Sequence, residues 1–259
     1  MEPTVRVLTP ADPAPFLEER TDGSSDFLIT VDHAANRIPV ALGDLGVSAS
    51  ERQRHIAWDI GALGIARGLS ERLDATLIAT NYSRLVIDCN RDPSVPSSMP
   101  TLSEYTPIPG NENLDGPARH ARAEEIFRPY QQRIADLIDQ RRDAGRATIL
   151  VCQHSMTDLY KGIRRAMHAA ILYNRDRRFA GAVLDALRAE PGLIVADNEP
   201  YFVSDETDYT VPVHAERRGL LHVEIEVRQD LVTTASGQAE WADRLSRALM
   251  NARLAILGV

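Results

Sequence analysis

The sequence ITVDHAANRIP, residues 29–39, decides how the rest of the chain is interpreted. Its first residues belong to a short, β-branched apolar run, FLITV at 27–31, which is typical of a buried strand and which ends in Asp32 and His33. In α/β sheets, ligands bind outside the carboxyl ends of the strands, so His33 lies where chemistry usually happens. A histidine at this position can also do no more than cap the strand end through a hydrogen bond.

The composition excludes several classes of protein. The 259 residues carry a formal net charge of −8, with a pI near 5.4, which argues against a nucleic-acid binder because phosphate contacts need clustered Lys and Arg. Two cysteines, Cys89 and Cys152, make no disulfide framework, so a reducing compartment is expected. Neither a cleavable leader nor an apolar run of roughly 20 residues is present, which predicts a cytoplasmic protein that does not insert into membranes.

Helical and strand patterns alternate along the chain, and its length fits a single domain, residues 1–259. The alternation predicts an α/β fold of three layers, in which a mixed, mostly parallel central sheet has helices on both faces. Residues 1–25 are expected to form an extended lead-in, and residues 89–116 begin with a Pro- and Ser-rich stretch typical of a functional lid or mobile segment. The expected strands are residues 27–31, 75–80, 84–88, 148–152, 169–173, 193–196 and 222–227, and the expected helices are residues 54–73, 116–144, 177–189 and 238–256.

Three polar residues are candidates for metal ligands. His33 and His154 each follow a predicted strand, and Asp59 falls on or beside the buried face of the helix predicted at 54–73. A buried carboxylate needs a partner, because an isolated buried charge is very costly. Two imidazoles and a carboxylate suit a catalytic Zn²⁺ with an open position for water. The spacing alone is weak support, since neither an HExxH nor a CxxC pair is present.

The strand pattern HVEIEV at 222–227 adds a candidate catalytic acid. Its alternation places Glu224 and Glu226 on one face, which Arg228 continues. Two acids within a strand are costly unless they are paired or catalytic, and glutamate is a usual base for taking the proton of an attacking water in zinc hydrolases. The alternative is a strand with one wet face and a ladder of Glu and Arg.

The segment RLVIDCNR at 84–91 places cations at and beyond a predicted strand end. Arg84 and Arg91 have forked guanidinium groups that can bind a carboxylate bidentately, and Asp88 can hold one of them in place. Asn90 belongs to the same group. The alternative is a structural ion pair between Asp88 and Arg91.

Several familiar motifs are absent from the sequence. There is neither GxGxxG nor GxxxxGK[ST], so nucleotide binding is unsupported, and the lack of GxSxG weakens a serine hydrolase. A thiolate role for Cys152 stays open, although a buried cysteine is far more often part of a core.

With these residues collected, the chain resembles the N-formylglutamate amidohydrolase family. The resemblance implies a fold related to that of zinc carboxypeptidases and aspartoacylases, with a mixed central sheet flanked by helices. It also implies hydrolysis of the formyl amide of N-formyl-L-glutamate to formate and glutamate. The segments that carry it cover most of the chain in order: VDHAANRIP at 31–39, WDIGALGIA at 58–66, NYSRLVIDCNRDP at 81–93, QHSMTDLYKG at 153–162, DNEPYF at 197–202 and RGLLHVEIEVRQDLV at 218–232.

The resemblance further implies roles for individual residues. His33 and His154 resemble metal ligands, and Glu226 resembles the general base. Carboxypeptidases take their third ligand from a Glu three residues after the first His, whereas this chain has Asn36 there. Asp59 is our candidate for the third ligand, because it is the acid on a buried helical face. The candidates for substrate binding are Arg84, Asn90, Arg91, Asn198, Tyr201 and Arg228.

The combined hypothesis is a Zn²⁺-dependent amidohydrolase that acts on a small N-acyl amino acid. In it, Zn²⁺ held by the two histidines and Asp59 polarises a water and the scissile carbonyl, and Glu226 moves the proton from the water to the departing amine. Two alternatives stay open. One is a zinc hydrolase of another N-acyl amino acid or a small peptide, and the other is a catalytically silent protein that binds a dicarboxylate through its arginines.

Overall fold

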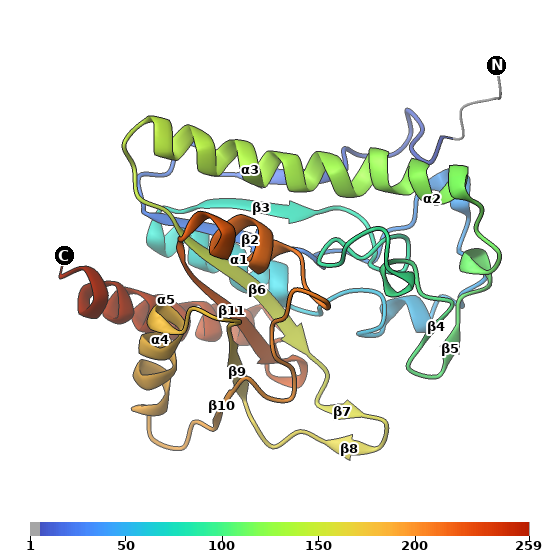
Figure 1. Ribbon diagram of the computed structural model, residues 1–259. Coiled ribbons are helices and arrows are strands. Elements are labelled where there is room, and N and C mark those ends of the chain that lie inside the picture. Colours follow the sequence, from blue (N-terminus) through green and yellow to red (C-terminus); the bar gives the residue numbers. More distant parts are fainter. Residues whose placement is uncertain (1–5, 259) are drawn as a thin grey trace.

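The computed structural model describes residues 6–258 and is built on a seven-stranded sheet (Figure 1). The strand order is β1-β3-β2-β6-β11-β9-β10. These strands are β1 (Phe16–Glu19), β2 (Phe27–Val31), β3 (Thr76–Thr80), β6 (Ile149–Met156), β9 (Ala169–Leu172), β10 (Val195–Asp197) and β11 (Leu221–Arg228).

Most neighbouring strands in this sheet are parallel. The four central strands β3, β2, β6 and β11 run in one direction, and the edge strand β1 is antiparallel to β3. At the other edge, β9 is antiparallel to β11 and parallel to β10. The predicted mixed, mostly parallel sheet is confirmed.

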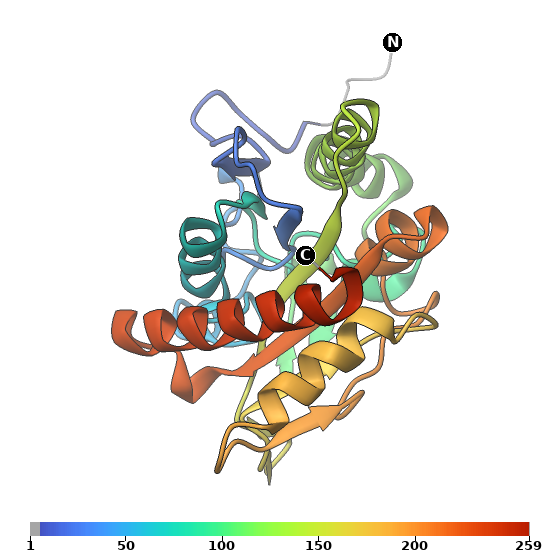
Figure 2. The ribbon, with the colours of Figure 1, turned by 90° about the vertical axis from the view of Figure 1, so that its left-hand side faces the viewer.

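Helices cover both faces of the sheet, which confirms the predicted three layers. α3 lies along one face, in line with the shorter α2 (Figure 1). α1, α4 and α5 lie on the opposite face, where α5 packs beside α4 (Figure 2). The helices are α1 (Ala62–Leu73), α2 (Gly116–Arg122), α3 (Arg128–Asp143), α4 (Arg178–Arg188) and α5 (Ala235–Leu257), with a π-helical turn at Ala123–Phe127 between α2 and α3.

The alternation of side chains along the central strands decides which residues reach the site. Odd-numbered residues such as Ile29 and Val151 enter the core with α1, α4 and α5, and even-numbered residues such as Leu28 and Leu150 enter the core under α3. Because both faces are covered, β2 and the first half of β6 are nearly continuous apolar runs. Asp32 after β2, His154 in β6, and Glu224 and Glu226 in β11 are at even-numbered positions, so these polar side chains lie on the α3 side of the sheet.

Two predicted elements are corrected by the structure. Residues 84–88 form turns instead of a strand, and their apolar side chains are buried because they fill the core on the α3 side without joining the sheet. The helix predicted at 54–73 begins at Ala62. Before it, Gly61 has a left-handed φ of +81°, and a Cβ there would meet the Val232 carbonyl oxygen at 2.4 Å. Asp59 therefore lies on the turn before the helix and not on the helix itself.

Two further boundaries differ from the prediction. β6 continues to Met156, beyond the expected end at residue 152, so His154 lies within the strand. In the expected lead-in, residues 1–5 lie outside the described residues, and Phe16–Glu19 forms the edge strand β1.

Short hairpins follow the central strands at the end of the molecule to which β6 points (Figure 1). The segment at 89–116 contains the hairpin of β4 (Leu102–Ser103) and β5 (Thr106–Pro107), and β6 leads into the hairpin of β7 (Leu159–Tyr160) and β8 (Ile163–Arg164). No helix within residues 6–258 is both long and apolar enough to cross a membrane. The remaining short helical turns are Val40–Leu42, Glu51–Gln53, Pro96–Ser98, Pro109–Asn111, Val211–Ala215, Glu216–Arg218 and Gln229–Leu231.

Candidate metal centre and active site

A cavity of about 520 Å³ lies at the carboxyl ends of β2, β6 and β11. Residues from both hairpins line it, as do residues of the turns at 84–91 and of the segment at 200–208. Ligand sites of α/β sheets occupy this edge, so the cavity is the place to test the predicted residues.

His33, Asp59 and His154 come together in the wall of this cavity. His33 follows β2, His154 lies within β6, and the backbone N–H of Asp59 donates a hydrogen bond to the His33 carbonyl oxygen at 2.9 Å. One potential ligand atom from each residue lies within 4.8 Å of the other two. The exposed fraction of each residue is 3–4%, so the three predicted ligands form one buried cluster.

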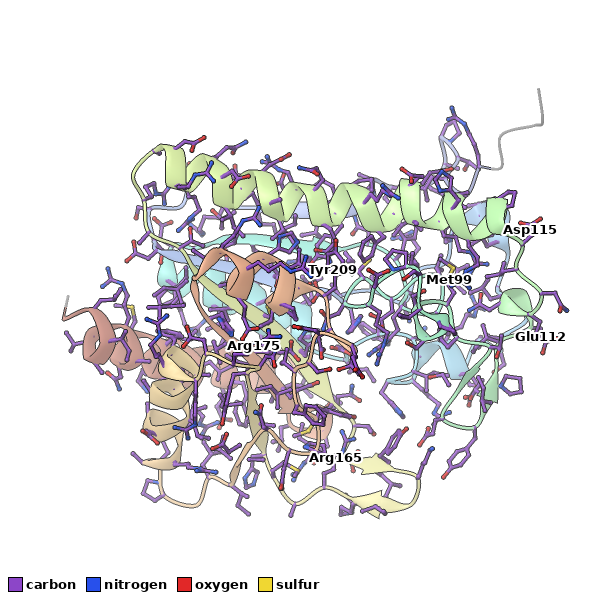
Figure 3. All side chains as sticks on the ribbon, in the orientation of Figure 1. Met99, Glu112, Asp115, Arg165, Arg175 and Tyr209 are labelled. Carbon is purple, nitrogen blue, oxygen red and sulfur yellow. The ribbon has the colours of Figure 1, made fainter. Side chains whose placement is uncertain are left out.

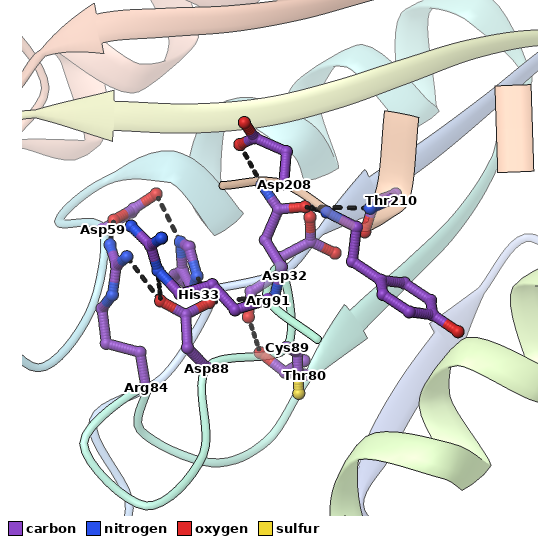
Figure 4. Close-up of polar contacts among 12 residues, drawn as sticks. Asp32, His33, Asp59, Thr80, Arg84, Asp88, Cys89, Arg91, Asp208 and Thr210 are labelled. Atoms are coloured by element: carbon purple, nitrogen blue, oxygen red, sulfur yellow. Dashed lines mark hydrogen bonds and ion pairs between the residues drawn. The ribbon is translucent and has the colours of Figure 1, made fainter. Parts of the chain in front are cut away.

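The two imidazoles have the same orientation relative to Asp59. The Nδ1 atoms of His33 and His154 lie 3.4 and 2.9 Å from Asp59 Oδ2. Their outer Nε2 atoms face carboxylates. His33 Nε2 lies 2.7 Å from Asp88 Oδ1 (Figure 4), and His154 Nε2 lies 3.6 Å from Asp32 Oδ2. Metal-binding histidines usually have such an outer carboxylate, which sets the tautomer and the ring orientation.

These residues fit a divalent metal ion such as Zn²⁺. Two imidazole nitrogens and a carboxylate oxygen are a ligand set of catalytic zinc sites. The buried Nδ1 of His33 has no hydrogen-bond partner within residues 6–258, although Asp59 Oδ2 lies 3.4 Å from it. A cation between the three ligand atoms would give this nitrogen a partner.

The charges around the cluster also favour a cation. Carboxylates outnumber guanidinium groups in the cavity wall, so carboxylates that no arginine neutralises are available to balance the charge of a bound cation. The acidic residues that line the cavity are Asp59, Asp88, Glu104, Asp208, Glu224 and Glu226, and the arginines are Arg84 and Arg91.

The histidines and carboxylates of this cluster shift one another's pKa values. Burial opposes the charged form of each member, but the opposite charges outweigh it. The pKa of His33 is raised because Asp88 and Asp59 face it, and that of His154 is raised well above its ordinary value beside Glu224 and Asp59. The same histidines lower the pKa of Asp59. A bound metal ion would take the place of the imidazole protons, since metal ligands must be deprotonated.

β11 brings two glutamates to the cavity. Glu226 is paired with His154 in the parallel register and Glu224 with Cys152, so Glu226 is level with a candidate ligand. Each glutamate is at most 9% exposed and has a carboxylate oxygen without a hydrogen-bond partner in the described part of the chain. The alternative of a wet strand face is therefore wrong. Burial and the nearby Asp59 raise the pKa of Glu226 to about 7, and burial raises that of Glu224 well above its ordinary value.

Asp88 connects the arginines to the metal cluster. While its Oδ1 faces His33, its Oδ2 accepts a hydrogen bond from Arg84 Nη2 at 2.6 Å and lies 3.4 Å from Arg91 Nε (Figure 4). Burial opposes its charge, yet Arg84 and His33 hold the pKa of Asp88 well below its ordinary value. Both arginines line the cavity, and the predicted support by Asp88 and the alternative ion pair with Arg91 are both present.

Asn90 and Tyr201 also line the cavity, with their polar groups already engaged. The Asn90 amide donates to Asp208 Oδ1 at 3.1 Å and accepts from the backbone N–H groups of residues 209–210 at 3.0 and 2.9 Å. It therefore ties this loop to the cavity wall. The Tyr201 hydroxyl accepts a hydrogen bond from Arg165 Nη2 at 2.5 Å.

Two predicted substrate-binding residues lie outside the cavity wall. The Asn198 side chain accepts a hydrogen bond from the Tyr173 N–H at 2.9 Å, and its own φ of +52° fits a turn after β10. Arg228 donates to the backbone carbonyls of residues 165–167 and pairs with Asp230 at 2.7 Å. Both side chains hold protein segments in place, so neither is retained as a substrate ligand.

Other residues of the site were missed by the sequence reasoning. Asp32 faces His154 and accepts a hydrogen bond from the Tyr130 hydroxyl at 2.7 Å. The position of Asp32 directly after a buried strand could have identified it as a residue of the site. Tyr130 is contributed by α3 and Asp208 by a distant loop, and nothing in their local sequence connects them with the cavity.

Cys152 is part of the core on the α3 side. It is fully buried, and burial raises the pKa of its thiol well above the ordinary value. A thiol in such surroundings stays protonated and inert, which favours the core interpretation over a thiolate.

Comparison with known proteins gives a family match and similar structures. Residues 25–233 match the family model of N-formylglutamate amidohydrolase. The fold is similar to that of a gene product from Agrobacterium tumefaciens, with 39% sequence identity and a TM-score of 0.94 over 97% of this chain and 100% of that one. It is also similar to an N-formylglutamate amidohydrolase from Ralstonia eutropha, with 21% identity and a TM-score of 0.69 over 95% and 100% of the two chains. None of the curated proteins matches this chain.

Proposed function

Because this chain belongs to the N-formylglutamate amidohydrolase family, we propose that it hydrolyses N-formyl-L-glutamate to formate and L-glutamate with one bound Zn²⁺. The observation that carries the proposal is the buried group of His33, Asp59 and His154 beside Glu226 in one cavity. We further propose that residues 1–259 act as one catalytic domain, since residues as far apart in the sequence as His33 and Glu226 line the same cavity.

The proposed ligands and their supports have separate tasks. His33, Asp59 and His154 would hold the ion, and Asp88 and Asp32 orient the two imidazoles through their outer nitrogens. The chemistry that Zn²⁺ supplies when bound is polarisation of the formyl carbonyl and a lower pKa for the attacking water.

Glu226 is the proposed general base. Its carboxylate takes a proton from water as the water oxygen bonds to the formyl carbon. It then passes that proton to the amide nitrogen as the C–N bond breaks, which yields formate and the free amine of glutamate. Its register with His154 and its unpartnered carboxylate oxygen support this role.

Arg84 and Arg91 are proposed to orient the substrate. Each guanidinium has five N–H donors, so the contacts with Asp88 leave donors that can face a substrate carboxylate. Asn90 fixes the wall beside them, and Tyr201 lines the same cavity. Positioning of this kind holds the amide in a reactive geometry.

Steady-state rates on a panel of amides test the proposed substrate. The zinc-loaded protein is assayed with the N-formyl and N-acetyl derivatives of L-glutamate and L-aspartate and with a short peptide. We expect N-formyl-L-glutamate to have the highest kcat/KM, by about tenfold or more, because one methylene or methyl group changes discrimination by that order.

The other outcomes of this panel separate the alternatives. A higher kcat/KM for another member would mean a zinc hydrolase with a different substrate. Binding of a dicarboxylate without turnover of any panel member would mean a silent binding protein and would overturn the proposed function.

A further inference from the structure

The cavity arginines that the sequence singles out already share one carboxylate, that of Asp88. Arg84 Nη2 lies 2.6 Å from Asp88 and Arg91 Nε lies 3.4 Å from the same carboxylate. Arg84 Nη1 also lies 3.7 Å from Asp59. A dicarboxylic substrate that enters this acidic cavity therefore needs at least one cation that the protein has not already paired.

Arg165, in the segment directly after β8, is a candidate for this unpaired cation (Figure 3). The residue is 7% exposed, and its guanidinium carbon lies 5.4 and 4.7 Å from the ring centres of Tyr160 and Tyr201. Nη1 donates to the Thr157 carbonyl oxygen at 3.3 Å and Nη2 to the Tyr201 hydroxyl at 2.5 Å. Thr157, Tyr160 and Tyr201 all line the cavity, so the guanidinium lies directly behind its wall.

This guanidinium has no acidic partner within 4.0 Å among residues 6–258. It makes two hydrogen bonds to the protein, although a guanidinium has five N–H donors. Arg122 is a useful contrast, because this buried arginine away from the cavity donates to two backbone carbonyls and the Asn111 amide oxygen. Arg122 is satisfied as part of the core, whereas Arg165 keeps spare donors beside the cavity.

We propose that Arg165 binds a carboxylate of the substrate and selects acidic substrates over neutral ones. The proposal rests on the function proposed above, which supplies the dicarboxylic substrate. The two tyrosine rings and the Thr157 carbonyl hold the guanidinium in one orientation, so little side-chain entropy is lost when a carboxylate arrives. When a substrate carboxylate takes the place of the Tyr201 hydroxyl as the acceptor of Nη2, the Tyr160 ring and the Thr157 carbonyl oxygen still hold the guanidinium.

The test compares Arg165→Gln with Arg164→Gln in the zinc-loaded protein. Arg164 is the matched control, because it is the neighbouring residue, its side chain is 72% exposed and it pairs with Asp158 at 2.8 Å. Calorimetry measures the affinity for glutarate. Kinetics measure kcat and KM for N-formyl-L-glutamate and for its α-monoamide and γ-monoamide.

For Arg165→Gln, we expect glutarate binding and kcat/KM for N-formyl-L-glutamate to fall roughly 30-fold or more, the value of a lost charge-assisted contact. The monoamide that lacks the carboxylate bound by Arg165 should lose much less activity in this variant. The insensitive monoamide therefore identifies which substrate carboxylate Arg165 binds. Arg165→Lys should recover part of the loss, and Arg164→Gln should behave as the unsubstituted protein.

An equal fall for the diacid and both monoamides would overturn the proposal, because it would show a purely structural role. Unchanged glutarate affinity in Arg165→Gln would overturn it as well. If the unsubstituted protein bound glutarate but hydrolysed none of the formyl substrates, the proposed function would fail, and the glutarate measurement alone would still decide the role of Arg165.

Discussion

Replacement of Glu226 by Gln should lower kcat for N-formyl-L-glutamate by about 100-fold or more while the zinc content stays the same. Glutamine has the size of glutamate but cannot take a proton from water. Glu226 is level with His154 across β11 and β6, lines the cavity and keeps an oxygen without a partner in the described residues. Stopped assays of formate release together with zinc analysis of the same samples measure both quantities.

Two further glutamates make this result specific. Glu240→Gln is the matched control, because its side chain on α5 is 68% exposed and pairs only with Arg244 among the contacts within residues 6–258. It should retain full turnover. Glu224→Gln tests the neighbouring cavity carboxylate, which is level with Cys152 and not with a candidate ligand. If Glu224→Gln abolished turnover and Glu226→Gln did not, the base would be Glu224.

The second large effect is expected for Asp59→Ala. The Nδ1 atoms of His33 and His154 both face the Asp59 carboxylate, at 3.4 and 2.9 Å. Loss of this carboxylate removes the group that connects the two histidines. Removal even of an outer support of a metal ligand costs 10- to 100-fold in metal affinity, so we expect zinc to bind roughly 100-fold more weakly or worse. Formate release at limiting zinc should fall in parallel.

Thermal unfolding separates metal loss from misfolding in this variant. Zinc at about 100 times its dissociation constant should stabilise the unsubstituted protein by roughly 2.7 kcal/mol, and Asp59→Ala should show almost none of this gain. In EDTA the variant should unfold at a lower temperature, because the two buried histidines lose the carboxylate they share, so the zinc-induced gain of each protein is measured from its own value in EDTA. Asp143→Ala is the control, because that side chain is 69% exposed at the end of α3. A normal zinc response in Asp59→Ala would remove this residue from the ligand set.

The central strands could be predicted from the sequence because burial on both faces leaves a strong pattern. Residues 27–31 match β2, and HVEIEV falls within β11. The same pattern was misleading at 84–88, where apolar residues fill the core from a turn. A local run of apolar residues indicates that a segment is buried. Only the strand pairing of the whole sheet distinguishes a buried strand from a buried turn.

The site could be predicted in part for a related physical reason. His33 and His154 lie toward strand ends, where topology gathers ligands, so their meeting follows from the fold class. Asp59 was selected for its burial, yet it is positioned by a turn that Gly61 ends and by a backbone hydrogen bond to His33. The support of Asp32 by Tyr130 depends on where α3 crosses the sheet, and no local pattern contains that information.

The most direct test of the metal centre is anomalous diffraction from crystals grown with zinc, measured above and below the zinc absorption edge. We expect one strong anomalous peak within coordination distance of His33 Nδ1, His154 Nδ1 and the Asp59 carboxylate, with Asp88 on the outer nitrogen of His33. A fully zinc-exposed crystal with no peak at this position, or with a peak held by other residues, would contradict this expectation.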